Sequence, residues 1–210
     1  MKNVDDLIQS AAELTEDGLS KGEIADELNV SRQTASWLVE RGGQSKDREP
    51  TSGEGPTDIH VDWSAIGRDS ARLEYVSHAM ADLLRKQGED IDLIVGVEKA
   101  GVPMATMVGR ELGTDLCTYA PSKHQWDEDD VEDLGGSFSR NFAGIRNREC
   151  YVIDDVSSSG TTMHETVEAV REEGGEPVAC VVLVDKRGVD EIDGVPVYSL
   201  VEVVPIRSDE

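Results

Sequence analysis

Apolar positions near the start of the chain recur at the spacing of short α-helices. Six apolar side chains between residues 4 and 14 fall at helical spacing. Ser20 and Glu23 match a capping box that opens a second helix, and Ser31 is placed to cap a third helix over residues 32–42. The pattern therefore predicts a small all-α domain of three helices.

Further along the chain, apolar runs without polar alternation are separated by segments with helical spacing. The predicted buried strands are residues 91–97, 115–119, 149–153 and 178–184, and the predicted helices are residues 65–84, 103–112 and 161–173. Such an alternation indicates a parallel sheet covered on both faces, with ligands at the carboxyl ends of its strands. The predicted fold class is α/β, with a doubly wound, mainly parallel sheet.

The two patterns are separated by a stretch that is almost free of apolar residues and rich in Gly, Pro, Ser and charge. This composition is typical of a flexible linker. We therefore predict a helical domain at residues 1–42, a linker at 43–58 and a larger domain at 59–207. A chain of 210 residues is long enough for two domains, because one domain typically has about 100–150 residues.

The chain is strongly acidic, with 44 Asp and Glu residues against 20 Lys and Arg residues and a net charge of -24. Only seven of the basic residues are Lys, while 38% of all residues are hydrophobic, which argues against general disorder. At 1 M salt, charges are screened within about 3 Å, so such a surface tolerates its self-repulsion. We therefore predict a halophilic protein.

The cysteines and the hydropathy predict a cytoplasmic protein. Cys117, Cys150 and Cys180 lie in or beside apolar runs without CxxC spacing, which predicts buried free thiols in a reducing cytosol and no metal site. No stretch approaches the roughly 18 apolar residues of a membrane span, and Met1 begins a polar helix rather than a signal peptide. We expect no membrane partner.

The second and third predicted helices resemble a helix-turn-helix DNA-binding unit. Small Ala25 allows the two helices to cross closely, and Val30 fills the corner between them. In such units the second helix enters the major groove with its N-terminal residues against base edges. The resemblance assigns DNA contacts to Ser31, Arg32, Gln33, Thr34, Ser36 and Arg41. Arg32 would read guanine and Gln33 adenine, while Ser31 and Arg41 would contact phosphate.

An alternative for this segment is an acidic cap that docks on the larger domain or on a partner. Residues 1–42 carry four basic and nine acidic side chains, whereas a DNA-binding face is normally basic. Residues 31–41, however, contain two Arg and one Glu, so the predicted recognition helix has a small net positive charge although the rest of the segment is acidic. We therefore favour DNA binding.

The sequence VIDDVSSSGTT, residues 152–162, combines two acidic residues with a loop suited to an anion. The loop supplies backbone N–H groups and hydroxyls at a helix N-terminus, where the helix dipole favours phosphate. Asp154 and Asp155 would repel phosphate, but they can accept hydrogen bonds from the two hydroxyls of a ribose. The combination predicts a ribose 5-phosphate site. The chain lacks the P-loop lysine and any G-x-G-x-x-G, so nucleoside triphosphates and dinucleotides fit poorly.

This sequence resembles the signature of type I phosphoribosyltransferases, which bind 5-phosphoribosyl 1-pyrophosphate, commonly with magnesium. The resemblance implies that Asp154 and Asp155 hold the ribose hydroxyls. It assigns the 5-phosphate to Ser157, Ser158, Ser159, Gly160 and Thr161, and the pyrophosphate to Glu98, Lys99, Ala100 and Gly101 in VGVEKAGVPMA. Chain order and spacing match orotate phosphoribosyltransferases best, over roughly residues 58–205. The alternative is an acidic strand end that meets a Ser-rich turn by chance.

The region of the catalytic hood departs from that family. Orotate enzymes close a Lys-rich, His-containing hood over the pyrophosphate. Here Lys123 and His124 are candidate remnants of a hood, but six of the seven residues 127–133 are acidic and would repel a pyrophosphate, or form a solvated acidic surface. Lys186 and Arg187 lie where the family contacts the base, or belong to a polar strand end. We assign no catalytic residue.

Two functions fit these features. An orotate phosphoribosyltransferase of pyrimidine nucleotide biosynthesis needs no helix-turn-helix, whereas a regulator that reuses the fold as a metabolite sensor needs one. The whole chain resembles the haloarchaeal orotate phosphoribosyltransferase-like transcriptional regulators of sugar catabolism, the GfcR type. The resemblance implies promoter DNA and a phosphorylated sugar or phosphoribosyl metabolite as partners, and a homodimer. It implies no tightly bound cofactor, with Mg²⁺ accompanying a phosphoribosyl pyrophosphate-like ligand. We predict the regulator, with the transferase as the alternative.

Overall fold

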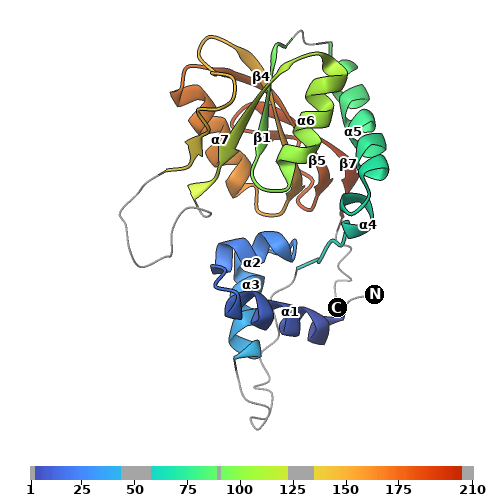
Figure 1. The fold of residues 1–210 in the computed structure, drawn as a ribbon, viewed down its shortest axis with the longest axis vertical. Helices are drawn as coiled ribbons and strands as arrows, with labels where there is room; N and C mark the ends of the chain where they lie inside the picture. Colours follow the sequence, from blue (N-terminus) through green and yellow to red (C-terminus); the bar gives the residue numbers. More distant parts are fainter. Residues whose placement is uncertain (1–2, 44–57, 89–90, 123–134, 205–210) are drawn as a thin grey trace, which may run out of the picture. The chain divides into compact units, whose positions relative to one another are not determined.

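The computed structural model of the chain describes residues 3–43, 58–88, 91–122 and 135–204 (Figure 1). These residues form two compact units, and the boundary between them falls between Asp62 and Trp63. The predicted linker, apart from its two ends, and the acidic run at 127–133 lie outside the described residues. The hood candidates Lys123 and His124 lie outside them too.

The first unit contains the three predicted helices, α1 (Val4–Glu16), α2 (Lys21–Glu27) and α3 (Arg32–Gly42). The capping box between Ser20 and Glu23 is present at the start of α2, and the Ser31 side chain accepts a hydrogen bond from the Thr34 N–H at the start of α3. The apolar faces of the helices share one core, which consists of Leu7, Ala11, Ile24, Ala25, Leu28, Val30, Ala35 and Leu38. The three predicted helices are therefore present, and they pack around one core.

The segment Asp58–Asp62 belongs to this first unit, although the sequence pattern assigned residues from 59 onward to the larger domain. The Ser31 backbone N–H donates to a carboxylate oxygen of Asp58 at 2.6 Å. The Asn29 side-chain amide donates to the Val61 carbonyl at 2.9 Å. Both bonds attach the segment to the turn between α2 and α3.

The second unit is built on a seven-stranded sheet with the order β3-β2-β1-β4-β5-β7-β6. The strands are β1 (Leu93–Val97), β2 (Asp115–Ala120), β3 (Ser137–Phe138), β4 (Glu149–Ser157), β5 (Glu176–Asp185), β6 (Glu191–Ile192) and β7 (Val195–Glu202). The five central strands pair in parallel, and the short edge strands β3 and β6 pair antiparallel. The four predicted strands are confirmed within a mainly parallel sheet, whereas β3, β6 and β7 were not predicted.

Helices cover both faces of this sheet, as the sequence pattern indicated (Figure 1). The helices of the unit are α4 (Ser64–Gly67), α5 (Ser70–Arg85), α6 (Gly101–Leu112) and α7 (Thr161–Glu172). α6 packs closely on one face of β1, because a Cβ on Gly96 would lie 2.7 Å from the Cβ of Ala105. On the other face, Val167 and Val170 of α7 share a buried cluster with Val95 of β1. The alternating residues of β1 thus face two different helical layers.

Candidate functional site

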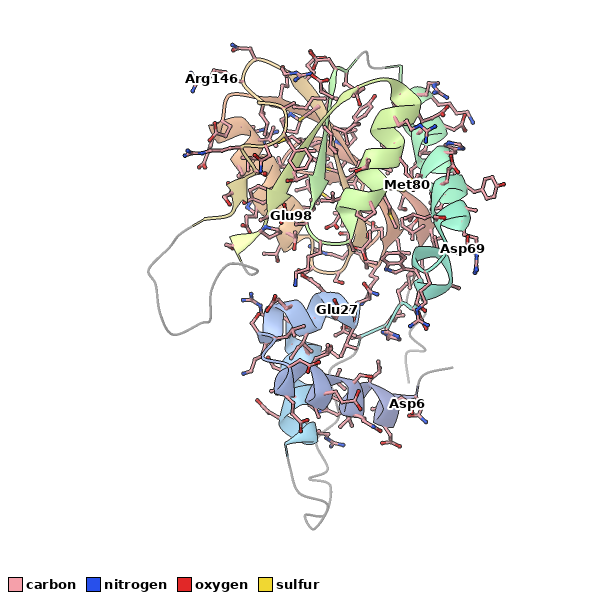
Figure 2. All side chains as sticks on the ribbon, in the orientation of Figure 1. Asp6, Glu27, Asp69, Met80, Glu98 and Arg146 are labelled. Atoms are coloured by element: carbon pink, nitrogen blue, oxygen red, sulfur yellow. The ribbon has the colours of Figure 1, made fainter. Side chains whose placement is uncertain are left out.

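The sheet order places two predicted loops next to each other. β1 and β4 are adjacent and parallel, and β1 continues to β2 on one side while β4 continues to β5 on the other. The carboxyl ends of strands at such a switch point form the ligand-binding crevice of open α/β sheets. The segment Glu98–Gly101 follows β1 there, and Asp154 and Asp155 lie toward the end of β4. Figure 2 labels Glu98 at the end of β1.

The acidic pair lies within β4, which extends to Ser157 rather than ending at Ile153 as predicted. Asp154 pairs with Val182 of β5 in the ladder and is only 9% exposed, while Asp155 is half-buried. The Asp155 backbone N–H donates to Asp154 Oδ1 at 2.9 Å. The two carboxylates are therefore held by a central strand rather than by a loose turn.

The loop after β4, predicted to hold phosphate, leads into α7 through a glycine in the left-handed conformation. Gly160 is the N-cap residue of α7. Its φ of +77° lies in the left-handed region, which glycine adopts more readily than other residues. The Ser159 hydroxyl donates to Thr161 Oγ1 at 3.0 Å and accepts from the Thr161 N–H at 3.4 Å. Ser157 is 5% exposed, and its hydroxyl has no hydrogen-bond partner among the described residues. A buried hydroxyl in that state is uncommon in native proteins.

The loop after β1 is joined to its neighbours by two hydrogen bonds. The Glu98 N–H donates to the Tyr119 carbonyl at 2.8 Å, and the Thr118 hydroxyl donates to Glu98 Oε1 at 3.0 Å. The Glu98–Lys99 peptide bond is cis, and the Lys99 side chain is exposed. Both partners of Glu98 lie on β2, so the position of the predicted pyrophosphate loop is set by two adjacent strands.

Gly101 brings this loop against the acidic strand. A Cβ added at Gly101 would lie 2.6 Å from the Ile153 carbonyl oxygen and 2.9 Å from the Asp154 Cα. Both are backbone atoms that cannot move away independently of β4. The sequence-predicted residues of the two loops are therefore in close contact, and only glycine permits this approach.

We expect Gly101→Ala to destabilise the second unit and to weaken binding of 5-phosphoribosyl 1-pyrophosphate. The added methyl group must push α6 away from β4, and overpacking of this kind typically costs about 1–3 kcal/mol. Thermal unfolding in molar KCl measures the first effect, and calorimetry with the ligand measures the second. Gly144→Ala is the matched control, because a Cβ at Gly144 meets nothing within 4 Å. Equal behaviour of the two variants would contradict the prediction.

Arg187 lies against the loop after β4. Its guanidinium donates to the Ser159 carbonyl, and the Lys186 backbone N–H donates to the Ser157 carbonyl at 2.9 Å. Buried Asp185 orients this turn by accepting from the Arg187 N–H at 2.8 Å. The structure therefore brings a cation to the predicted phosphate loop, where the sequence comparison had suggested a contact with the base.

The predicted DNA-contacting residues of α3 differ in their accessibility. Arg32 and Gln33 are exposed, and Ser31, Ser36 and Arg41 are partly exposed. Thr34 is only 8% exposed, and its hydroxyl shares a 2.9 Å hydrogen bond with the Ser31 hydroxyl. Thr34 is therefore less accessible than the predicted DNA contact requires, because its hydroxyl is bonded at the start of the helix. The Arg41 guanidinium lies 4.6 Å from the centroid of the Trp37 ring.

The described residues contain neither a reactive thiol nor a protein-built metal centre. Burial raises the pKa of Cys117 to about 11 and the pKa values of Cys150 and Cys180 to about 12, so the three free thiols stay protonated at neutral pH. Within the part of the chain that the structure describes, no three His, Cys, Asp or Glu side chains group in a way that could hold a metal ion.

The sequence reasoning missed Trp63 as a member of the site. Its indole Nε1–H donates to Asp155 Oδ2 at 2.9 Å, across 92 positions of sequence. Thr118, the partner of Glu98, was missed as well. No local pattern marks either residue, because both reach the site only when the sheet assembles.

Comparison with known proteins identifies the second unit. Residues 62–204 match the model of the phosphoribosyl transferase domain family. The orotate phosphoribosyltransferase of Mycobacterium tuberculosis, solved with inorganic phosphate, superposes with a TM-score of 0.55 and 20% identity, over 70% of this chain and 80% of that one. At that identity the likeness concerns the fold alone. No helix in the described part of the chain is long and apolar enough to span a membrane.

Similarity to curated proteins extends over the whole chain. The transcriptional regulator GfcR of Halorubrum lacusprofundi is 70% identical over 211 residues, which cover all of both chains. The protein of the same name from Methanocella arvoryzae is 42% identical and covers 97% of this chain and 98% of its own length. Both alignments thus span the three-helix segment as well as the sheet domain. The chain therefore belongs to the GfcR family of transcriptional regulators, with a phosphoribosyl transferase domain at residues 62–204.

Proposed function

We propose that the protein binds promoter DNA through α3 and senses a phosphorylated sugar or phosphoribosyl metabolite in its phosphoribosyltransferase-like domain. The observation that carries this proposal is the close approach of Gly101 to Asp154, which unites two intact ligand loops in a chain that also carries a three-helix unit. The names of the relatives support a role in transcription. A metabolite site joined to a DNA-binding unit makes a regulator that responds to its ligand.

The ligand chemistry follows from the side chains of the site. The buried Ser157 hydroxyl, the backbone around Gly160 and the Arg187 guanidinium offer donors and a cation to a phosphate. Asp154 and Asp155 offer acceptors to a ribose diol. Magnesium usually binds through ligand phosphates and water with one or two carboxylates, so Mg²⁺ would enter together with a diphosphate ligand.

DNA binding and assembly complete the proposal. Arg32 and Gln33 are exposed in the first turn of α3, where a recognition helix presents its base-reading side chains. One such helix contacts about one half-site, so we propose a homodimer that places two of them on a pseudo-palindrome. The target promoters would belong to genes of central sugar catabolism. A promoter-binding protein of this kind works in the cytoplasm.

We propose that the site binds its ligand without efficient transfer chemistry. In orotate enzymes a basic hood stabilises the charge of the pyrophosphate, and the corresponding sequence here is acidic over residues 127–133. Without that stabilisation the pyrophosphate is a poor leaving group. An assay with orotate and 5-phosphoribosyl 1-pyrophosphate in molar KCl should therefore show no turnover comparable to a true transferase.

The function is tested by following DNA binding and ligand binding in the same protein. Chromatin immunoprecipitation should recover promoters of sugar-catabolism genes. Fluorescence anisotropy on a recovered fragment in molar KCl should change when 5-phosphoribosyl 1-pyrophosphate or ribose 5-phosphate is added, and light scattering should report a dimer. The proposal would be overturned if the protein bound none of the recovered promoters. It would also be overturned if the protein catalysed orotate phosphoribosyl transfer efficiently.

A further inference from the structure

Trp63, the first residue of the second unit, contacts the candidate ligand site of that unit. Trp63 precedes α4, and its indole N–H donates to Asp155 Oδ2 at 2.9 Å. The ring is held over Gly67, because a Cβ at Gly67 would lie 2.5 Å from a ring carbon of Trp63. The indole therefore occupies the surroundings of a carboxylate oxygen to which we assign a ribose hydroxyl.

Three of the five residues before Trp63, namely Asp58, His60 and Val61, are hydrogen-bonded to the turn that precedes α3. Besides the bonds of Asp58 to the Ser31 N–H and of Val61 to the Asn29 amide, His60 Nδ1 donates to the Leu28 carbonyl. We refer to residues 58–63 as the strap. Three bonds hold its first part on the α2–α3 turn, and one holds its last residue on Asp155. The strap is only six residues long, and both of its end residues are hydrogen-bonded.

The strap also places a negative charge where DNA would bring a phosphate. Asp58 accepts the Ser31 N–H at 2.6 Å, and Ser31 is the N-cap of α3. The N-terminus of a helix attracts anions, and a DNA phosphate would need the same N–H group and the same end of the helix dipole. While the strap is in place, Asp58 competes with that phosphate and repels its neighbours on the DNA backbone.

We propose that the strap couples the two units: a ribose diol displaces the Trp63 indole from Asp155, and the strap then withdraws Asp58 from the N-terminus of α3. In this arrangement the ligand-free protein holds α3 in a state of low DNA affinity, and the ligand raises that affinity. The inference rests on the proposed function. Allosteric coupling of this kind typically changes affinity by about 5- to 150-fold and is reciprocal, so DNA strengthens ligand binding by the same factor.

Trp63→Phe tests the first half of the coupling, because it keeps an aromatic ring over Gly67 and removes only the N–H donor. Without ligand, this variant should bind promoter DNA about as tightly as the ligand-saturated wild type does. Addition of ribose 5-phosphate or 5-phosphoribosyl 1-pyrophosphate should then change its DNA affinity less than twofold, although calorimetry still detects the ligand. Tyr75→Phe, a change of an exposed aromatic residue on α5, should behave like the wild type.

Asp58→Asn tests the second half, since the amide oxygen can still accept the Ser31 N–H while the charge is lost. Its ligand-free DNA affinity should rise. Glu27→Gln removes the same charge from an exposed position at the end of α2 and should change the affinity much less. Asp58→Asn leaves the bond between Trp63 and Asp155 intact. The ligand affinity of this variant without DNA should therefore differ from wild type by less than about fivefold, which is the smallest effect typical of allosteric coupling.

Tryptophan fluorescence supplies a measurement that does not involve DNA. With Trp37→Phe and Trp126→Phe combined, the emission of Trp63 should shift when either ligand is added. If a ligand binds without that shift, and Trp63→Phe keeps the coupling of the wild type, the proposed role of the strap is wrong. The proposed function would then remain intact. If neither ligand binds wild type in calorimetry, both the strap and the metabolite-sensing role are wrong.

Discussion

Replacing Arg32 and Gln33 together by alanine is expected to abolish specific promoter binding. Both side chains are exposed in the first turn of α3, where each can make a bidentate contact with a base edge. Each such contact discriminates by about 1–3 kcal/mol, so the pair contributes about 2–6 kcal/mol per half-site. Since 1.4 kcal/mol is about tenfold in affinity, specific binding should fall by about 30-fold or more.

High salt makes this loss more visible. Much of the affinity of ordinary DNA-binding proteins comes from counterion release, which molar salt suppresses. For the halophilic DNA-binding protein that we propose, with its net charge of -24, we therefore expect a greater dependence on contacts with base edges and on DNA shape. The two exposed side chains therefore carry a larger share of the binding free energy than they would in a dilute cytosol.

The measurement is fluorescence anisotropy in molar KCl, with chromatin immunoprecipitation in cells as its counterpart. The matched control is Arg146→Ala combined with Gln87→Ala, which removes the same side-chain types from the second unit; Figure 2 labels Arg146. Calorimetry should show that both double variants still bind ligand. If promoter occupancy survives the change in α3, this helix does not read the DNA, and the acidic docking cap becomes the better explanation of the first unit.

The second large effect is expected at the acidic pair. Asp154→Ala combined with Asp155→Ala should remove detectable binding of ribose 5-phosphate and 5-phosphoribosyl 1-pyrophosphate. Hydrogen bonds to charged groups contribute about 1.5–3 kcal/mol each, so two lost bonds correspond to about 3–6 kcal/mol. Dissociation constants should therefore rise by at least about 100-fold, because each 1.4 kcal/mol is about tenfold.

Glu172→Ala combined with Glu173→Ala is the control for this variant. It removes another adjacent acidic pair, at the C-terminal end of α7, where both side chains are exposed. Calorimetry measures the affinity, and circular dichroism in the same buffer establishes that each protein is folded. Asp154 is buried in β4, so its replacement by alanine could also disturb folding. Asp154→Asn combined with Asp155→Asn therefore serves as a second variant, which keeps the side-chain volumes similar. Unchanged affinity in folded acidic-pair variants would show that the ligand lies elsewhere.

Much of the architecture was predictable because it depends on local patterns. The helices α1, α2, α3, α5 and α7 and the buried strands β1, β2, β4 and β5 have apolar spacings that short stretches of chain carry by themselves. The two ligand loops were recognisable for a related reason: a parallel sheet brings the carboxyl ends of its strands to one edge, so VGVEKAGVPMA and VIDDVSSSGTT were expected to meet.

Other features depend on pairing between distant residues. Carboxylates are poor strand formers, and β4 continues through Asp154 and Asp155 because the ladder with β5 satisfies its backbone. The edge strands β3 and β6 are two residues long and carry no periodicity, so their pairing with β2 and β7 defines them. The half-buried strand β7 contains polar and proline positions that masked its apolar pattern.

The sequence by itself therefore determined the three N-terminal helices, the α/β class and the positions of the two candidate ligand loops, because local patterns along the chain carry each of them. Only the tertiary structure decided that Thr34 is buried, that Arg187 lies beside the loop predicted to hold phosphate and that Trp63 donates to Asp155. No local sequence pattern indicates these contacts. They arise when packing within each unit fixes its backbone, and so burial and hydrogen bonding over long sequence distances decide them.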